Sequence, residues 1–254
     1  MGIPLSIAVS HNKNTCLLLP QINQHLSRLL KNDWFEIEFW QKNLAITGSS
    51  QGRSTTWFIG HENDEWVLRH YHRGGWMAKI MADRYFYFRP KTTRCFAELA
   101  LLETMYQQGL PVPKPIAARF IKRGLIYRAD LLIEKIPRAC DLVAHLQKEK
   151  LSEANWHAVG SMIAKFHEAG IFHADLNAHN ILVDDTPEFW LIDFDKCRRL
   201  NPEDKWQQAN LDRLHRSFVK ESKRHSLFYF DEQCWHWLIS GYQSFYHLSP
   251  NARH

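Results

Sequence analysis

Apolar side chains recur at every third or fourth position over residues 93–108, which is the spacing of one helix face. This spacing places Glu98 and Glu103 elsewhere on the helix surface. Gly109 follows directly and has the backbone freedom that commonly ends a helix. The pattern therefore predicts a long helix whose apolar stripe consists of Phe96, Leu99, Leu102 and Met105.

Short runs rich in β-branched and aromatic residues lie on both sides of this helix and predict strands. Three runs precede it and two follow it, at residues 44–47, 55–59, 65–71, 116–120 and 125–133. Together with the helix they predict a small β-rich lobe, which with an N-terminal extension takes up residues 1–136. The extension shows no pattern beyond a short helix near residues 24–31.

The second half of the chain is predicted to be mainly helical. Asp141 can cap a short helix that reaches Leu146, and Ser152 opens a longer helix that Gly170 closes. Two further helices are predicted over residues 202–223 and 231–246. We therefore expect an α+β protein of two lobes, with a minimal, mainly helical C-terminal lobe at residues 137–254.

A polar string, His173-Ala-Asp-Leu-Asn-Ala-His-Asn180, precedes two short apolar strands that lead to Asp193-Phe-Asp195. The spacing H-x-D-x-x-x-x-N followed by D-F is typical of phosphoryl-transfer sites. Such a site needs one Asp to orient and deprotonate the attacking hydroxyl. It also needs an Asn and a second Asp to hold divalent metal against the nucleotide phosphates. We assign the base to Asp175 and the metal ligands to Asn180 and Asp193.

Residues 172–182 and 189–197 resemble the lipopolysaccharide kinase family of bacteria, and the likeness extends from about Gly48 to the C-terminus. The resemblance implies a bilobal protein-kinase-like fold and an enzyme that uses ATP and Mg²⁺. It further implies transfer of the γ-phosphate to a hydroxyl of the 3-deoxy-D-manno-octulosonic acid (Kdo) sugar of a lipid A precursor. The expected partners are this lipid and the anionic surface of the inner membrane on its cytoplasmic side. We expect neither nucleic acid nor an obligate protein partner.

The elements that would hold the nucleotide in the first lobe are less regular. Gly48-Ser-Ser-Gln-Gly52 lies between two predicted strands, where a Gly-rich loop could contact phosphate or simply form a hairpin turn. The strand Trp66-Val-Leu-Arg69 resembles the V-A-I-K strand of kinases but carries Arg in place of Lys. Lys79 is the alternative cation.

The partner carboxylate of this cation should be Glu98, with Glu103 less favoured because it lies farther along the helix and faces differently. The resemblance also implies an interlobe hinge from Glu134 to Ile136 whose backbone meets the adenine. His173 should be structural and tie the catalytic loop to the backbone near Asp193. Asp195 is either a metal-side or substrate group or one half of a salt bridge.

The composition restricts the class of protein but does not indicate a function. The 254 residues are 45% hydrophobic and 23% charged, which suits a folded globular chain. Five cysteines without a C-x-x-C pair suggest reduced thiols rather than disulfides or zinc. No apolar run approaches the roughly 18–20 residues of a spanning helix, and the first residues lack a signal-peptide pattern. We therefore expect a peripheral protein.

The net charge of +5 is compatible with nucleic acid, an anionic membrane or a phosphorylated substrate. Within residues 69–94 basic side chains alternate with aromatic ones, a composition that suits the interface of a bilayer. The same pattern also fits a solvated face beside a packed aromatic cluster.

Three other functions stay open on sequence alone. A small-molecule phosphotransferase of the aminoglycoside or choline type shares the same loop and metal chemistry. A catalytically inactive kinase fold that serves as a binding module is suggested by Arg69 and the irregular glycine loop. A basic nucleic-acid binder is least favoured, because no recognition motif accompanies the charge.

Overall fold

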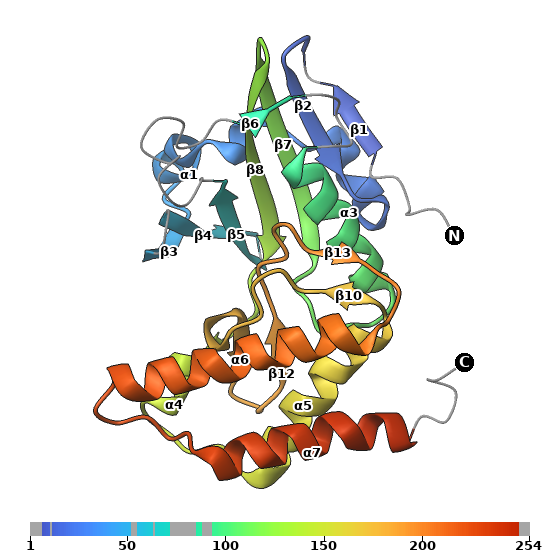
Figure 1. Cartoon of the computed structure of the whole chain (residues 1–254). Helices are drawn as coiled ribbons and strands as arrows, with labels where there is room; N and C mark the ends of the chain where they lie inside the picture. The colour runs from blue at the N-terminus through green and yellow to red at the C-terminus, as the bar shows by residue number, and fades with distance from the viewer. Residues whose placement is uncertain are drawn as a thin grey trace. The chain divides into compact units, whose positions relative to one another are not determined.

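The computed structural model of the chain describes residues 7–10, 12–51, 55–62, 64–71, 85–87 and 93–248 (Figure 1). The chain forms two compact units. The first takes its described residues from 1–108 and 113–135, and the second from 109–112 and 136–254. The chain therefore passes from the first unit into the second, returns for two strands, and leaves again after Lys135.

A single antiparallel sheet forms the framework of the first unit. Along the sheet the strand order is β1-β2-β7-β8-β5-β4-β3, and β6 pairs separately with β8. The strands are β1 (Ile7–Ser10), β2 (Thr15–Leu19), β3 (Ile46–Gln51), β4 (Thr55–His61), β5 (Asp64–His70), β6 (Tyr85–Phe86), β7 (Pro115–Arg123) and β8 (Ile126–Glu134).

The five predicted strands are present as β3, β4, β5, β7 and β8, but their number was too small, because β1, β2 and β6 also join the sheet. The first two form a hairpin in which the side-chain oxygen of Asn12 accepts hydrogen bonds from the N–H groups of Asn14 and Thr15, each at 2.8 Å. Asparagine favours such turns because its side chain satisfies backbone donors locally. Two short apolar runs around an Asn-rich turn were the available signal for this hairpin.

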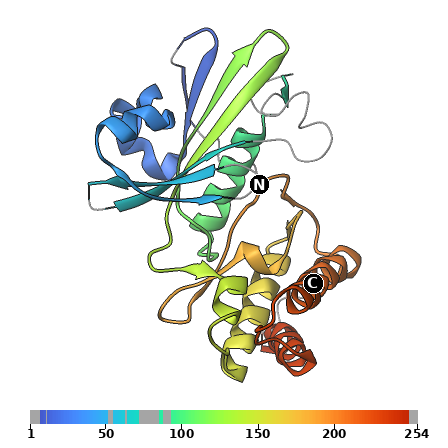
Figure 2. The same ribbon diagram turned by 90° about the vertical axis from the view of Figure 1, so that its left-hand side faces the viewer.

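The two faces of the sheet are covered by different segments of the chain. Helix α3 (Arg94–Gln107) lies on one face (Figure 2). The other face carries the 3₁₀ turn η2 (Asn32–Phe35) and the short helix α1 (Ile37–Lys42), which follow another 3₁₀ turn, η1 (Gln21–Arg28).

The helix predicted near residues 24–31 is therefore a 3₁₀ segment that begins earlier. Asn23 has non-helical angles of φ −111° and ψ 24° within it. The side-chain amide of Asn23 donates to the carbonyl groups of Pro115 and Ile116 at 2.7 and 3.2 Å. This tertiary contact, absent from any local pattern, overrides a regular helix.

An aromatic cluster fills the face beneath these N-terminal turns. Trp34, Trp40 and Trp66 are buried there, and the Trp40 ring N–H donates to the Trp34 carbonyl at 2.8 Å. The ring of His61 stacks on Trp66 with centroids 4.0 Å apart. The N-terminal extension thus supplies core side chains to the first unit rather than a separate appendage.

The second unit is mainly helical, as predicted. The N-terminal caps also follow the sequence: Asp141 accepts from the N–H groups of Val143 and Ala144 at 3.1 Å, and Ser152 accepts from Asn155 at 3.2 Å. The helices are α4 (Leu142–Leu146), α5 (Glu153–Glu168), α6 (Asp204–Arg224) and α7 (Glu232–Leu248). Short strands connect them: β9 (Cys140–Asp141), β10 (Ile171–Phe172), β11 (Ile181–Val183), β12 (Phe189–Leu191) and β13 (Arg198–Arg199).

Helices α5 and α7 pack side by side with their backbones in close approach. A side-chain carbon at Gly160 would overlap the carbonyl oxygen of Leu238, and one at Gly241 would overlap the carbonyl oxygen of His157. The Ser161 hydroxyl donates to the carbonyl of Gly241 at 3.0 Å across the same contact. Glycine is therefore required at both positions for this helix pair.

Candidate active site

The candidate catalytic loop is held between β10 and a hairpin of two short strands. Strands β11 and β12 are antiparallel, with Ile181 opposite Leu191. The N–H of Ile192 donates to the carbonyl of Asn180 at 2.9 Å, which extends this pairing by one residue. Asn180 therefore lies beside the residue that precedes Asp193. The two residues assigned as metal ligands come from adjacent chain segments at one end of the strand pair.

His173 connects the start of this loop to its end. Its Nε2 donates to the carbonyl of Ile192 at 3.0 Å, while its Nδ1 accepts from the N–H of Asp175 at 3.3 Å. Burial lowers the pKa of His173, so the ring is neutral at physiological pH. A neutral ring with these two contacts fits the structural role that the sequence predicted for it.

The backbone of Asp175 is fixed by two amide side chains. Asn180 and Asn177 both donate to the main-chain carbonyl of Asp175, at 2.9 and 3.0 Å. The hydrogen bond between Asn180 and Asp175 is thus made to the main chain and leaves the carboxylate of Asp175 out of it. The carboxylate of Asp175 is 47% exposed, so it is accessible to a substrate hydroxyl.

Asp193 adopts a left-handed backbone conformation with φ of 64°, which is uncommon outside glycine. The next residue, Phe194, is buried, and its ring lies 5.1 Å from that of His173 and 5.9 Å from that of Phe166. The buried ring of Phe194 holds this segment in the core, while the backbone of Asp193 departs from strand geometry. Asp195 is half-buried two residues farther on, and its role stays a prediction.

The oxygens of Asn180 and Asp193, the two residues that the sequence assigns as metal ligands, are of the kind that magnesium prefers. Mg²⁺ prefers carboxylate and carbonyl oxygens and commonly uses only one or two protein carboxylates with phosphate and water. The Asn180 amide nitrogen is committed to Asp175, which leaves its side-chain oxygen as the coordinating end. Within the described residues no three His, Cys, Asp or Glu side chains gather in a metal cluster. Binding of Mg²⁺ by Asn180 and Asp193 therefore stays a prediction.

In the first unit, Arg69 of β5 and Glu98 of α3 are joined directly. One guanidinium nitrogen of Arg69 donates to both carboxylate oxygens of Glu98, at 2.9 and 3.0 Å. The hydroxyl of Tyr71, a residue that no sequence motif marks, also donates to Glu98, at 2.5 Å. Glu98 is buried, so these donors compensate the cost of burying its charge.

Glu103 faces elsewhere, as its position on the helix predicted. It accepts from the N–H of Ile22 at 3.1 Å and so holds η1 against α3. Burial raises the pKa of this carboxyl group. Its contact with the N-terminal segment explains why a second acid occurs on this helix.

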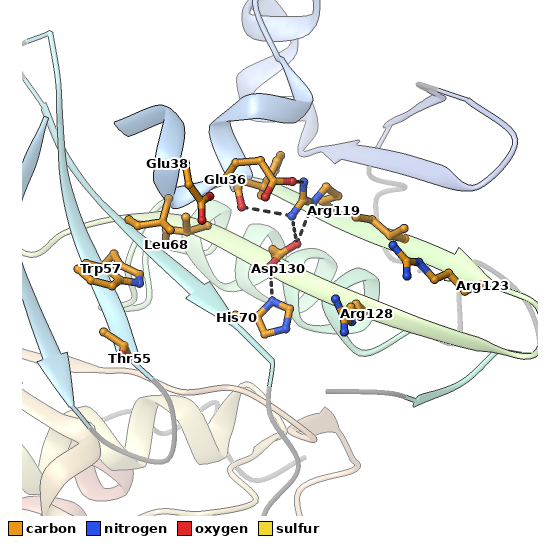
Figure 3. A pocket seen from close by; sticks show the side chains of 13 residues that line it. Glu36, Glu38, Thr55, Trp57, Leu68, His70, Arg119, Arg123, Arg128 and Asp130 are labelled. Carbon is orange, nitrogen blue, oxygen red and sulfur yellow. Dashed lines mark hydrogen bonds and ion pairs between the residues drawn. The ribbon is translucent and has the colours of Figure 1, made fainter. Parts of the chain in front are cut away.

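A cavity of about 700 Å³ opens on the sheet face opposite the Arg69–Glu98 pair (Figure 3). Leu68 and His70 line it, while Arg69 between them projects to the α3 face, because side chains alternate along a strand. Within the cavity wall, Arg119 and Asp130 are buried and hydrogen-bonded at 2.8 Å. Arg119 also donates to Glu36, which ties the N-terminal turns to the sheet.

The remaining nucleotide-site predictions have different outcomes. Gly48 is a strand residue of β3 opposite Phe58 rather than part of a loop, because β3 continues to Gln51. The predicted end of this strand at residue 47 was therefore wrong, whereas a contact of Gly48 with phosphate stays a prediction. Gly52 and Lys79 lie outside the described residues. Glu134 ends β8, and the chain enters the second unit at Ile136.

Most of the basic and aromatic segment at residues 69–94 also lies outside the described residues. In its described part, Tyr85 is buried, and its ring packs at a tilt against that of Tyr127, with centroids 5.5 Å apart. Phe86 is 58% exposed. At least one of the aromatics therefore belongs to a packed cluster.

Sequence reasoning missed the residues of α6 that contact the catalytic loop. Asn210 bonds both backbone groups of His173, Arg213 reaches the carboxylate of Asp175 at 3.3 Å, and Ser217 accepts from the N–H of Ala178 at 3.1 Å. Their spacing marks one polar face of a helix. Polarity alone does not tell such a face from one that is merely solvated.

The two units define a protein-kinase-like phosphotransferase. The β-rich unit has the Arg–Glu pair between strand and helix, and the helical unit has the catalytic loop. Comparison with known families makes the class specific. The chain belongs to the lipopolysaccharide kinase (Kdo/WaaP) family, whose model matches residues 37–242. It is thus a kinase, and membership of this family implies ATP as the phosphate donor.

Curated relatives cover most of the chain. A 3-deoxy-D-manno-octulosonic acid kinase from Photobacterium profundum is 47% identical over 209 residues, which is 82% of this chain and 88% of that protein. Proteins with the same name from Vibrio parahaemolyticus and Mannheimia succiniciproducens are 50% and 49% identical. These matches cover 74% and 83% of this chain, and 78% and 90% of the respective relatives.

Proposed function

We propose that this kinase transfers the γ-phosphate of ATP to a hydroxyl of the Kdo sugar in a Kdo-bearing lipid A precursor, a step in building the lipopolysaccharide inner core. The observation that carries the proposal is the geometry of the catalytic loop. In it the side chain of His173 hydrogen-bonds to the carbonyl of Ile192, and the side chain of Asn180 hydrogen-bonds to the carbonyl of Asp175. The choice of Kdo as the acceptor rests on the names of the relatives, and phosphoryl transfer as the reaction rests on the catalytic loop.

In this reaction Asp175 orients the acceptor hydroxyl and receives its proton. The oxygen of that hydroxyl bonds to the γ-phosphorus as the bond between this phosphorus and the β–γ bridging oxygen breaks. Asn180 and Asp193 would hold Mg²⁺, which would neutralise charge on the phosphates. Arg69, oriented by Glu98, contacts the phosphates from the first unit.

The other nucleotide contacts follow the same assignment. Gly48 and Gly52 belong to the segment that covers the phosphates, and the backbone between Glu134 and Ile136 meets the adenine. The N-terminal part up to residue 136 would hold the nucleotide, and residues 137–254 would hold the catalytic loop, the metal and the acceptor. Each of these roles follows from the family likeness and the motif positions.

We place the enzyme at the cytoplasmic side of the bacterial inner membrane as a peripheral protein. The acceptor is a membrane lipid, and the net charge of +5 favours an anionic surface. None of the helices in the described part of the chain has both the length and the apolar character to cross a bilayer.

Mass spectrometry of the lipid tests this function. Purified full-length protein is incubated with ATP, Mg²⁺ and either the Kdo-bearing lipid A precursor or the same lipid without Kdo. We expect one added phosphate on the first lipid only, and none when EDTA replaces Mg²⁺. Phosphate on the Kdo-free lipid, or no product from either lipid, would contradict the proposal.

One observation bears on the binding-module alternative. That alternative rests on Arg69 in place of lysine, yet Arg69 forms the ion pair with the helix carboxylate that an active site requires. The substitution thus keeps the interaction. Including an aminoglycoside acceptor in the same assay separates the small-molecule phosphotransferase alternative.

A further inference from the structure

Helix α6 lies along the catalytic loop and contacts it at successive residues. Asn210 accepts from the N–H of His173 at 3.2 Å and donates to its carbonyl at 3.0 Å. One turn later Arg213 reaches Asp175, and one turn beyond that Ser217 accepts from the N–H of Ala178. Asn210 and Ser217 satisfy backbone groups and so hold the loop in place. Arg213 differs, because its partner is the side chain of the proposed catalytic base.

The Arg213–Asp175 pair is a long and exposed ion pair rather than a buried structural one. A single nitrogen of Arg213 lies 3.3 Å from one oxygen of Asp175, and the two side chains are 49% and 47% exposed. Exposed single-contact pairs of this kind contribute little to stability. The Arg119–Asp130 pair of the first unit shows the contrast, with 2.8 Å and exposures of 5% and 4%. The contact with Asp175 can therefore be exchanged for another at small cost.

A base that must receive a proton gains nothing from a permanent cation on its acceptor oxygen, because a nearby positive charge favours the ionised carboxylate. The arrangement becomes useful if an incoming group shares the guanidinium. Arginine presents five N–H donors in a planar fork that matches a carboxylate with two parallel hydrogen bonds. An acceptor that carries both a hydroxyl and a carboxylate can then meet Asp175 and Arg213 together.

We propose that Arg213 binds the carboxylate of the acceptor sugar and so selects a sugar acid over a neutral sugar. This inference rests on the proposed function, in which the acceptor is an ulosonic acid whose carboxylate and hydroxyl groups belong to one small sugar unit. Recognition of the carboxylate next to the base fixes which face of the sugar is presented. Arg213 is thus a specificity-determining residue, and Asp175 keeps the role of base.

The test combines two enzymes with two acceptors. Arg213→Met is compared with the wild type on the Kdo-bearing lipid and on the same lipid with the Kdo carboxyl converted to its methyl ester. Arg216→Met, which removes an exposed arginine from the same helix, is the matched control. Arg213→Lys keeps the charge but loses the fork. Thermal unfolding of each variant checks that the protein is folded.

We expect esterification to lower kcat/KM of the wild type by about 10- to 100-fold, the usual effect of losing a charge-assisted hydrogen-bonded pair. Arg213→Met should show the same loss on the free acid and then no further loss on the ester. KM for ATP should stay unchanged. Arg213→Lys should fall between the two, and Arg216→Met should match the wild type.

Other outcomes overturn the inference. If Arg213→Met loses activity equally on the acid and the ester while the wild type still prefers the acid, Arg213 acts on Asp175 or on the transferred phosphate. A raised KM for ATP points to the phosphate. If the wild type phosphorylates the acid and the ester equally well, no carboxylate is read, although the kinase function stands. If the wild type phosphorylates neither, the proposed function and this inference fail together.

Discussion

The two aspartates of the catalytic segment differ in what surrounds them. Asp175 has its backbone fixed by two asparagines and its carboxylate half-exposed, whereas Asp193 sits in a left-handed conformation beside a buried phenylalanine. The first arrangement suits a group that approaches a substrate. The second suits a group that coordinates from a rigid position. Substitution should therefore separate their roles.

We predict that Asp175→Ala keeps nucleotide binding and lowers turnover by about 10²- to 10⁴-fold, the usual contribution of a general base. Asp193→Ala should lose turnover and also weaken binding of the Mg²⁺–nucleotide complex. Phosphate transfer is measured on the Kdo-bearing lipid, and nucleotide affinity by calorimetry with and without Mg²⁺. Near wild-type turnover in either variant would contradict the role given to that aspartate.

His167 gives the protein a pH-dependent stability. The Nδ1 of His167 lies within hydrogen-bonding distance of the Tyr242 hydroxyl, at 2.9 Å. Burial lowers the pKa of His167 from 6.5 to about 4. The unfolded chain therefore binds a proton at this residue more readily between those two pH values. The free energy of unfolding should fall as pH drops through this window, by up to ~3 kcal/mol once pH is below 4.

Urea unfolding at pH 7 and pH 5 measures this effect. In His167→Gln the loss of stability between the two pH values should be smaller than in the wild type. His157→Gln removes a more exposed histidine from the same helix and should leave the difference unchanged. An equal pH effect in wild type and His167→Gln would show that other groups are responsible.

At this scale the sequence predicts what lies close along the chain. The residues from His173 to Asp193 form one continuous motif, so their types and spacing are enough to indicate the chemistry. Tyr71, Asn210 and Arg213 escape prediction because their contacts depend on packing with distant segments. The pairing of Arg69 with Glu98 is predictable only because the family pattern relates a strand cation to a helix acid.

At the scale of elements, the contact between α5 and α7 leaves no room for added volume at its two glycines. Gly160 and Gly241 both lie where a side chain would meet the backbone of the other helix. We predict that Gly160→Ala lowers the free energy of unfolding by about 1–3 kcal/mol or more through overpacking, despite the better helix propensity of alanine.

Chemical denaturation provides the measurement, with Lys165→Ala as the control. Lys165 is exposed on the same helix, so its replacement should change stability by no more than ~0.5 kcal/mol. If Gly160→Ala were as stable as the wild type, the helices would have to separate at little cost, and the close approach would not matter energetically.

Helices and their caps were the most predictable elements, since periodicity and capping residues are local signals. The N-terminal turns were not predictable in the same way. Residues 32–35 are held by Arg119, which donates to the carbonyl of Phe35 at 3.2 Å and to the side chain of Asn32 at 3.0 Å. The sequence has no periodicity in this stretch, and the conformation of residues 32–35 depends on contacts with a distant arginine. Local patterns could therefore not predict it.

For the molecule as a whole, the positive charge predicts salt-dependent attachment to anionic bilayers. We expect the full chain to sediment with phosphatidylglycerol vesicles at low salt and to be released at about 0.5 M salt, where charges are screened within a few ångströms. Neutral phosphatidylcholine vesicles should retain little protein. Binding that is equal on both lipids, or insensitive to salt, would contradict an electrostatic attachment.

Variants in which basic residues are replaced by glutamine identify the surface that binds the membrane. One variant carries changes at Lys79, Arg84, Arg89 and Lys91, and its matched control carries them at the exposed residues Lys205, Arg216, Lys220 and Lys223 of α6. The first variant should lose most of the binding if residues 69–94 meet the membrane. A greater loss in the control would move the contact to the helical unit.

The division of the chain into two units has a consequence for attempts to take the enzyme apart. Residues 109–112 belong to the second unit although they precede β7 and β8 of the first, and the carbonyl of Pro111 accepts from the N–H of Leu191 at 3.0 Å. A cut after Lys135 would give a fragment that carries this tetrapeptide away from its neighbours. A recombinant C-terminal half starting at Ile136 would lack that acceptor for strand β12, directly ahead of Asp193. Co-expressed halves would have to bring Pro111 back beside Leu191 to restore this backbone hydrogen bond.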